Sequence, residues 1–170
     1  MSTTICFDFG NTRLKAAIFT NAEMVELRVL ETGSLQEIEK LLTEFSVEKT
    51  ILSSVVHHDK AIETLLAKST KFHLLGPSTV INFTTPVGKP ETIGADRLAL
   101  IAAAVDQFPH EHNLVISLGT CITYNFINNT HAFLGGSISP GMQMRFKAMH
   151  EQTALLPLIS PLQRVSLGGL

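Results

Sequence analysis

One unit, an apolar strand that runs into a short turn of glycine and threonine, occurs twice in this chain. The first copy is Thr4–Phe9 followed by Gly10-Asn11-Thr12, and the second is Leu114–Leu118 followed by Gly119-Thr120. A second apolar run follows each turn. Glycine lets backbone N–H groups approach a ligand closely, and a hydroxyl beside them suits a phosphate. Two such units predict two related halves that hold a nucleotide between them.

Size and composition favour a compact protein with a small-molecule ligand. The 170 residues are enough for one large domain or two small ones, and 45% of them are hydrophobic. The net charge of -2, without a run of Lys or Arg, argues against nucleic acid as the main partner. No apolar stretch reaches the roughly 20 residues of a membrane span, and the first residues enter a strand rather than a signal peptide. Cys6 and Cys121 lack metal-ligand spacing, which fits a reducing, cytoplasmic setting.

Hydrophobic patterning predicts the element order βββαβαβ for the first part of the chain. Ser34, with Glu37 three residues on, forms a capping-box pattern that marks the start of the first helix. A proline-containing loop over 80–91 and an apolar helix over 94–108, buried between two layers, follow. The predicted strands cover 4–9, 13–19, 24–30, 50–56 and 71–75, and a second helix covers 61–67.

The order then restarts, with strands over 114–118, 122–127 and 131–134, a glycine-rich loop over 135–141 and a helix over 142–155. We therefore divide the chain into a first half, 1–112, and a partial second half, 113–170. The second half lacks the later elements of the first, which predicts a truncated chain. A half-sheet cannot bury both of its faces, so further chain or a partner is expected to cover it.

The first turn carries groups that suit a nucleotide and its metal ion. Asn11 and Thr12 add side-chain donors to the glycine backbone, and Lys15 can neutralise phosphate charge. Asp8, at the end of the strand, can hold a magnesium ion directly or through water. Ordinary hairpin chemistry is the alternative interpretation of Gly-Asn-Thr.

Gly94-Ala95-Asp96-Arg97 opens the apolar helix. The macrodipole stabilises a carboxylate at a helix N-terminus, and beside a phosphoryl acceptor Asp96 could take the proton of an attacking hydroxyl. Arg97 could clamp an anion or pair with Asp96. The alternative is that Asp96 only caps the helix and that Arg97 only forms an ion pair.

The second turn and the loop after it offer a further anion site. Thr120 repeats the glycine and hydroxyl arrangement of the first turn. Gly135-Gly136 and Pro140-Gly141 bracket a segment before a helix, whose N-terminus could face a nucleotide. A hairpin and a plain strand-to-helix connection are the alternatives.

Together these motifs resemble type III pantothenate kinase, a family first described as Bvg accessory factor, a proposed transcriptional activator. The resemblance rests on the order and spacing of four motifs over residues 4–158, namely Asp8-x-Gly10-Asn11-Thr12-x-x-Lys15, Gly94-Ala95-Asp96-Arg97, Gly119-Thr120-x-x-Thr123 and Gly135-Gly136-x-Ile138-x-Pro140-Gly141. It implies an α/β actin-like ATPase fold of two ribonuclease H-like halves, the second incomplete here. It also implies a cytoplasmic homodimer that phosphorylates pantothenate with ATP, Mg²⁺ and a monovalent cation (K⁺ or NH₄⁺), the first step of coenzyme A synthesis.

Carried over residue by residue, the resemblance assigns Asp96 as the proton acceptor and Gly94, Ala95 and Arg97 as its neighbours in the pantothenate site. Two positions depart from the family. Ser117 stands where the family usually has the Asp that holds the monovalent cation, and Val87 where it has a tyrosine that touches pantothenate. The ATP-binding residues that it implies are Asp8, Phe9, Gly10, Asn11, Thr12, Arg13, Leu14, Lys15 and Thr120, with Asp8 also a metal ligand.

Two other functional classes share parts of this pattern. A non-catalytic nucleotide-binding or regulatory domain would keep the glycine turns, and the departures at Ser117 and Val87 favour it. A ribonuclease H-like nuclease shares the strand order, but it needs several carboxylates clustered on two metal ions. Ser117 removes one such carboxylate, and the charge balance opposes DNA binding.

Overall fold

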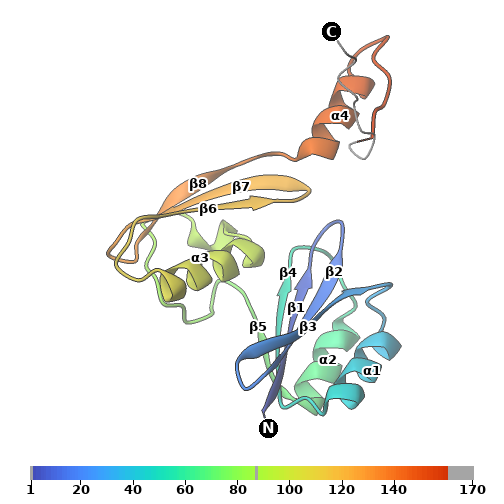
Figure 1. Ribbon diagram of the computed structural model, residues 1–170, viewed down its shortest axis with the longest axis vertical. Helices are drawn as coiled ribbons and strands as arrows, with labels where there is room; N and C mark the ends of the chain where they lie inside the picture. The colour runs from blue at the N-terminus through green and yellow to red at the C-terminus, as the bar shows by residue number, and fades with distance from the viewer. Residues whose placement is uncertain (1, 87, 161–170) are drawn as a thin grey trace.

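The computed structural model describes residues 2–86 and 88–160, which form a five-stranded sheet and a three-stranded sheet (Figure 1). The elements of the first part follow the predicted order βββαβαβ. Their bounds are β1 Thr3–Phe9, β2 Leu14–Thr20, β3 Glu23–Leu30, α1 Leu35–Phe45, β4 Lys49–Ser54, α2 Lys60–Ser69 and β5 Lys71–Leu74. The remaining elements are the 3-10 turn η1 Pro90–Thr92, α3 Ala95–Gln107, β6 Asn113–Leu118, β7 Cys121–Ile127, β8 Phe133–Pro140 and α4 Met142–Glu151.

The first sheet has the strand order β3-β2-β1-β4-β5. The first three strands form an antiparallel meander, and β4 and β5 run parallel to β1. The register places Asp8 opposite both Lys15 on β2 and Ser53 on β4. This is the order expected of a ribonuclease H-like half, and it leaves the end of β1 at the centre of the sheet edge.

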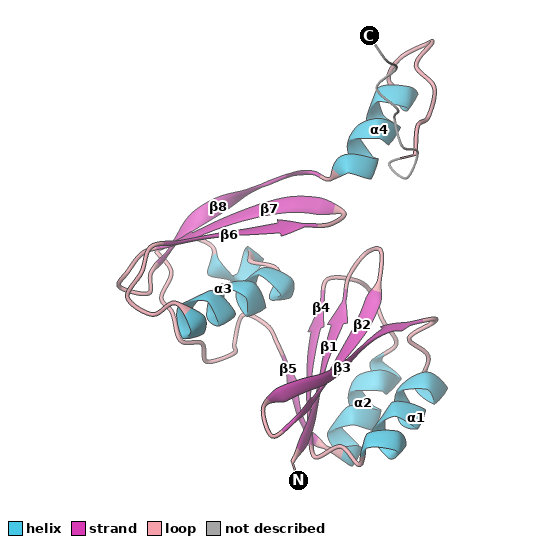
Figure 2. Ribbon diagram, viewed as in Figure 1, coloured by secondary structure: helices cyan, strands magenta, loops and turns pink. Residues whose placement is uncertain are grey.

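Helices α1 and α2 cover one face of this sheet, as Figure 2 shows. Alternate residues of β1 point into that layer, and Ile5, Phe7 and Phe9 are 0%, 2% and 1% exposed. Ile38 of α1 and Leu66 of α2 complete the same core. Because side chains alternate along a strand, Cys6 and Asp8 lie on the opposite face, here called the inner face.

The start of α1 confirms one half of the predicted capping box. Ser34 is the N-cap, and its Oγ accepts a hydrogen bond from the Glu37 amide at 3.3 Å. The Glu37 carboxylate does not return to Ser34 but accepts the amides of Glu31, Thr32 and Gly33 at 2.8, 3.1 and 2.8 Å. The positive φ of Gly33, 62°, bends the chain so that these amides converge on one carboxylate. Glu37 therefore fastens the β3–α1 connection.

The apolar helix predicted over 94–108 is confirmed as α3, and it lies between two layers. Leu98 and Ile101 are buried in its core. Ile51 of β4 packs on this core from the first sheet, and Val115 of β6 packs on it from the second. Helix α3 thus packs on the inner face of the first sheet and also on the face of the second sheet that carries Val115, which is likewise called its inner face.

Two predicted boundaries in the second part are wrong. The segment expected as a loop over 135–141 continues as strand β8 to Pro140, and the helix expected over 142–155 ends at Glu151. The glycines of this segment favoured a loop in the sequence, but in the structure they allow β8 to pack closely against β7. A Cβ on Gly136 would lie 1.9 Å from the Tyr124 carbonyl oxygen of β7.

The second sheet, β6-β7-β8, is antiparallel throughout and exposes its outer face. In the repeat, Leu114, Ile116 and Leu118 match the β1 residues buried beneath α1 and α2. They are 60%, 49% and 79% exposed instead. Helix α4 points away from this face, at the far end of β8 (Figure 1). The expected uncovered face is therefore confirmed for the described residues.

Candidate functional site

The first glycine turn joins β1 to β2 and is closed by a hydrogen bond from the Gly10 amide to the Arg13 carbonyl oxygen at 3.1 Å. On the inner face beside it, Lys15 Nζ lies 3.3 Å from Asp8 Oδ2, and both side chains remain partly exposed. Phe9 is buried in the core and Leu14 packs against it. Phe9 and Leu14, two of the predicted ATP-binding residues, could therefore contact a ligand through their backbone groups but not through their side chains.

The second glycine turn joins β6 to β7, and the Gly119 amide donates to the Cys121 carbonyl oxygen at 3.0 Å. The Thr120 hydroxyl lies 2.5 Å from the Thr12 hydroxyl of the first turn. These residues are 108 positions apart in the sequence. The fold therefore brings the two predicted phosphate turns together.

The start of α4 lies directly beside the second turn. The Gly141 amide donates to the Thr120 carbonyl oxygen at 3.0 Å. A Cβ on Gly141 would lie 2.2 Å from the Gly119 carbonyl oxygen, so this position needs glycine. The N-terminus of α4 therefore lies beside the second turn, and its predicted contact with a nucleotide stays a prediction.

Gly94 is the N-cap of α3 and places Asp96 in the first turn of that helix. Asp96 Oδ1 accepts the Arg97 amide at 2.8 Å. A Cβ on Gly94 would lie 2.6 Å from Asp96 Oδ1 and 3.7 Å from a methyl carbon of Val55. The Val55 amide in turn donates to the Phe9 carbonyl oxygen at 3.0 Å.

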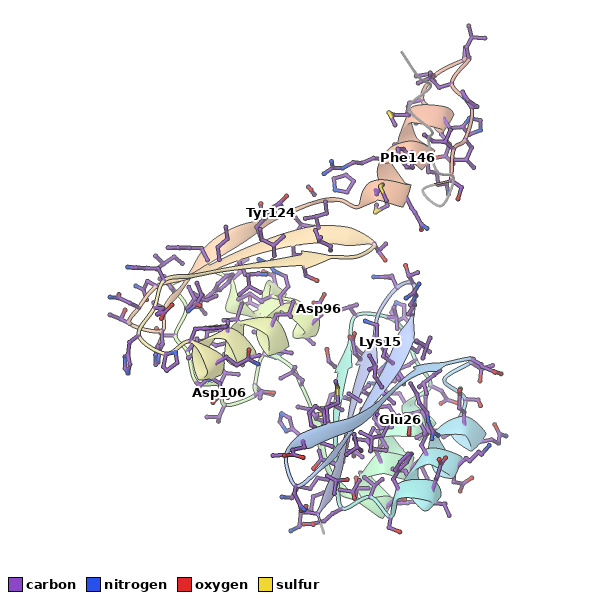
Figure 3. The ribbon with its side chains drawn as sticks, in the orientation of Figure 1. Lys15, Glu26, Asp96, Asp106, Tyr124 and Phe146 are labelled. Carbon is purple, nitrogen blue, oxygen red and sulfur yellow. The ribbon has the colours of Figure 1, made fainter. Side chains whose placement is uncertain are left out.

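This chain of contacts places the Asp96 turn at the end of β1 where Asp8 and the first glycine turn also lie. Figure 3 shows Asp96 at one end of α3 and Asp106 at the other, with Asp96 between the two sheets. The helix macrodipole favours a carboxylate at this end. Asp96, the predicted proton acceptor, the two predicted phosphate turns and Asp8, the predicted magnesium ligand, therefore surround one region on the inner side of both sheets.

Arg97 does not form the ion pair with Asp96 that the sequence left open as an alternative. Its Nε donates to Asn125 Oδ1 at 2.7 Å, and its guanidinium lies 5.7 Å from the centre of the Phe133 ring. Asn125 is fully buried on β7 and also donates through Nδ2 to Val115 O at 3.5 Å. Sequence reasoning missed Asn125, although an amide among apolar strand residues is an unusual choice that could have marked it.

Ser117 takes the place on β6 that Asp8 takes on β1. It lies opposite Thr123 on β7, so two hydroxyl residues share the inner face there. Among the described residues no group of three or more His, Cys, Asp or Glu side chains could hold a metal ion. Val87, the remaining predicted substrate contact, lies outside the described residues.

A hollow of about 540 Å³ lies behind the first turn. It is bounded by Asn11, by the start of α1 at Ser34 and by the start of α2 at Asp59. Gly10 and Asn11 of the first turn also line it, so the hollow adjoins this turn on the helical side of the sheet. Next to it, His58 Nε2 contacts Glu63 Oε1 at 2.9 Å, a pairing that ties the β4–α2 connection to α2.

The strand order and the paired turns define an α/β protein of the actin-like class. The family model of type III pantothenate kinase matches residues 4–168. A type III pantothenate kinase of Christiangramia forsetii is 41% identical over 159 residues, which cover 92% of this chain and 65% of that protein. The Flavobacterium johnsoniae protein of the same name is 39% identical over 155 residues, covering 90% of this chain and 64% of its own length.

This chain belongs to the type III pantothenate kinase family. It spans 65% and 64% of the length of those two relatives. It is also similar to a solved structure from Bacteroides thetaiotaomicron described as a protein with an actin-like ATPase fold and unknown function. That similarity has a TM-score of 0.47 at 8% identity and covers 89% of this chain and 75% of the other. Within the described residues, no helix has the length and apolarity needed to cross a lipid bilayer.

Proposed function

We propose that this chain carries the nucleotide site and the catalytic base of an enzyme that transfers the γ-phosphoryl group of ATP to pantothenate. The product would be 4'-phosphopantothenate, the first intermediate of coenzyme A synthesis. The observation that carries the proposal is the 2.5 Å contact between the Thr12 and Thr120 hydroxyls, which joins the two glycine turns. Family membership supports the choice of substrates.

ATP would bind where the turns meet. Backbone N–H groups of Asn11 and Thr12 and the Thr120 hydroxyl are donors of the kind that phosphate oxygens accept. Lys15 adds a positive charge 3.3 Å from the Asp8 carboxylate. Phosphoryl transfer depends mainly on positioning and charge neutralisation, and this cluster offers both.

Pantothenate would bind beside the first turn of α3, at Gly94–Arg97. Its primary hydroxyl would attack the γ-phosphorus in line with the leaving ADP, and the Asp96 carboxylate would accept the hydroxyl proton. Arg97 is held through Nε by Asn125, and among the described residues no hydrogen bond engages its two Nη groups, which could face an anion. The pantothenate carboxylate is an anion of suitable geometry.

The residues present fit a magnesium ion at Asp8, whose carboxylate is partly exposed at the site. A bound magnesium ion would neutralise charge on the transferred phosphoryl group. For the monovalent cation, Ser117 and Thr123 offer neutral hydroxyl oxygens on neighbouring strands. This donor set is weaker than one with a carboxylate, so we expect K⁺ or NH₄⁺ to bind weakly there.

We also propose that the enzyme is a cytoplasmic homodimer. Strand β3 is an edge strand with a row of exposed apolar side chains, Val25, Leu27 and Val29, which a second copy could cover. Cys6 and Cys121 are free thiols, as a reducing compartment would keep them. The organisation into a complete half, 1–112, and a partial half, 113–170, is part of the same proposal.

The decisive experiment is a coupled ADP-release assay on the purified 170-residue chain with ATP, Mg²⁺ and pantothenate at varied K⁺ or NH₄⁺. Pantothenate-dependent ADP release is the expected result. ATP binding without any turnover would instead favour a non-catalytic nucleotide-binding or regulatory domain. Absence of ATP binding would contradict both.

A further inference from the structure

A buried hydroxyl lies on the inner face of β4, next to Asp8. Ser53 is 8% exposed, and its Oγ has no hydrogen-bond partner among the described residues. It is the direct register partner of Asp8 in the parallel pair β1–β4. Paired residues of neighbouring strands point to the same face, so the Ser53 hydroxyl and the Asp8 carboxylate stand side by side.

The neighbours of Ser53 along β4 show where its hydroxyl points. Ile51, two residues before it, packs on the α3 core. Val55, two residues after it, lies 3.7 Å from the Cβ position of Gly94 at the start of α3. Because every second residue of a strand shares a face, Ser53 points toward the first turn of α3. Asp8 thus lies to one side of this hydroxyl and the Asp96 turn lies above it.

An unpaired buried hydroxyl costs stability, because it has lost its hydrogen bonds to water without replacing them. An apolar side chain such as alanine would not carry that cost. An unsatisfied polar group that persists between two carboxylate-bearing segments therefore points to a ligand that satisfies it.

We propose that Ser53 is a positioning residue that hydrogen-bonds a water in the hydration shell of the Mg²⁺ held by Asp8. This inference rests on the proposed nucleotide function. Mg²⁺ keeps several of its waters when it binds to proteins and phosphates, and each such water needs an acceptor or a neighbouring dipole. The Ser53 hydroxyl can accept a hydrogen bond from such a water. It can also donate a hydrogen bond to a phosphate oxygen or to the Asp8 carboxylate.

The test compares Ser53→Val with Ser53→Thr, two side chains of equal shape of which only threonine keeps the hydroxyl. The probe is the non-hydrolysable β,γ-imido analogue of ATP, and its affinity for the 170-residue chain is measured by calorimetry with and without Mg²⁺. We expect Ser53→Val to lose roughly tenfold in the Mg²⁺-dependent affinity, the effect of one hydrogen bond. Ser53→Thr should retain it, and affinity without Mg²⁺ should be equal in all three proteins.

Two further readouts separate this role from a structural one. Without ligand, Ser53→Val should melt at or above the temperature of the unmodified chain, because it removes an unsatisfied group. Ser54→Ala on the opposite face is the control, since Ser54 Oγ donates to Val56 O at 3.0 Å and its loss should lower stability without changing Mg²⁺ dependence. If either β-branched variant does not fold, Ser53→Ala replaces the pair and must show the valine result.

The inference is overturned if Ser53→Val binds the analogue with the same Mg²⁺-dependent affinity as the unmodified chain. Where Ser53→Ala replaces the pair, the same comparison is made with Ser53→Ala. Either result would leave the proposed function intact. Failure of the unmodified chain to bind the analogue with Mg²⁺ would contradict the proposed function itself.

Discussion

The hydroxyls of Thr12 and Thr120 lie 2.5 Å apart, although one residue belongs to the first half of the chain and the other to the second. Each hydroxyl follows a glycine at the end of a strand, so the contact brings two equivalent turns face to face. A phosphate placed there would receive donors from both halves.

Removing either hydroxyl should weaken ATP binding. Thr12→Ala and Thr120→Ala are each expected to raise the dissociation constant for Mg·ATP roughly tenfold, because a hydrogen bond to a charged phosphate is lost. Thr12→Ser should keep the affinity. Thr43→Ala is the matched control, since Thr43 is exposed on α1 and its hydroxyl bonds only Glu39 O within the described part of the chain. Calorimetric titration checks this, and unchanged affinity in both alanine variants would exclude the turns as the phosphate site.

Asp96→Asn should abolish most of the turnover and leave nucleotide binding in place. Loss of a general base typically lowers the rate by about 10² to 10⁴-fold. Asp106→Asn, an exposed carboxylate at the other end of α3, is the control and should turn over normally. Steady-state ADP release and ATP titration are the two measurements. Normal kcat in Asp96→Asn would remove Asp96 from the mechanism.

Gly94→Ala should lower kcat without preventing folding. The added Cβ would meet Asp96 Oδ1 at 2.6 Å, so the carboxylate has to turn away from its present position. A displaced base loses alignment with the substrate hydroxyl. Gly76→Ala serves as the control, because no heavy atom of residues 2–86 or 88–160 would lie within 4 Å of its Cβ. The pair is compared by kcat and by melting temperature, and equal kcat values would mean that the Asp96 geometry is unimportant.

Glu37 should make part of the stability of the first half depend on pH. Burial acts to raise the pKa of its carboxyl, but hydrogen bonds from the Glu31, Thr32 and Gly33 amides outweigh burial and hold the pKa below its ordinary value of 4.5. A lowered folded-state pKa stabilises the protein above pH 4.5, and this contribution is lost as the pH falls through the folded value.

We therefore expect Glu37→Gln to be less stable than the unmodified chain at pH 7 and to lose less stability between pH 5 and pH 3. Urea unfolding across this range checks the difference. Glu39→Gln, on an exposed position of the same helix, is the control and should follow the unmodified chain. Parallel pH profiles for Glu37→Gln and the unmodified chain would contradict this role.

Equivalent truncations in the two halves should have unequal costs. Phe7 is 2% exposed beneath α1 and α2, whereas Ile116 at the matching place of the second half is 49% exposed. Phe7→Ala should reduce the free energy of unfolding by about 3–5 kcal/mol, and Ile116→Ala by less than about 1 kcal/mol. Urea unfolding of both variants gives the comparison. A large cost at Ile116 would show that its face is covered in solution.

Much of the fold could be predicted because the local signals are strong. Alternating apolar residues marked β1, β2 and β3, and Ser34 marked the start of α1 within one residue. The glycine-rich segment from Gly135 to Pro140 was misjudged, because its pairing with β7 is a long-range property that composition does not show. Asn125 and Ser53 were missed for a similar reason, since their roles depend on which neighbours other strands bring.

The sequence by itself determined the periodicity of the strands and helices, the repeat of the glycine turns and the family to which the chain belongs, because these depend on residue types at short spacing. The tertiary structure alone decided that Thr12 meets Thr120, that Arg97 bonds Asn125 rather than Asp96, and that the outer face of β6 stays exposed. Such contacts join distant segments, and they arise only when α3 packs between the two sheets and the summed burial of both halves selects one arrangement.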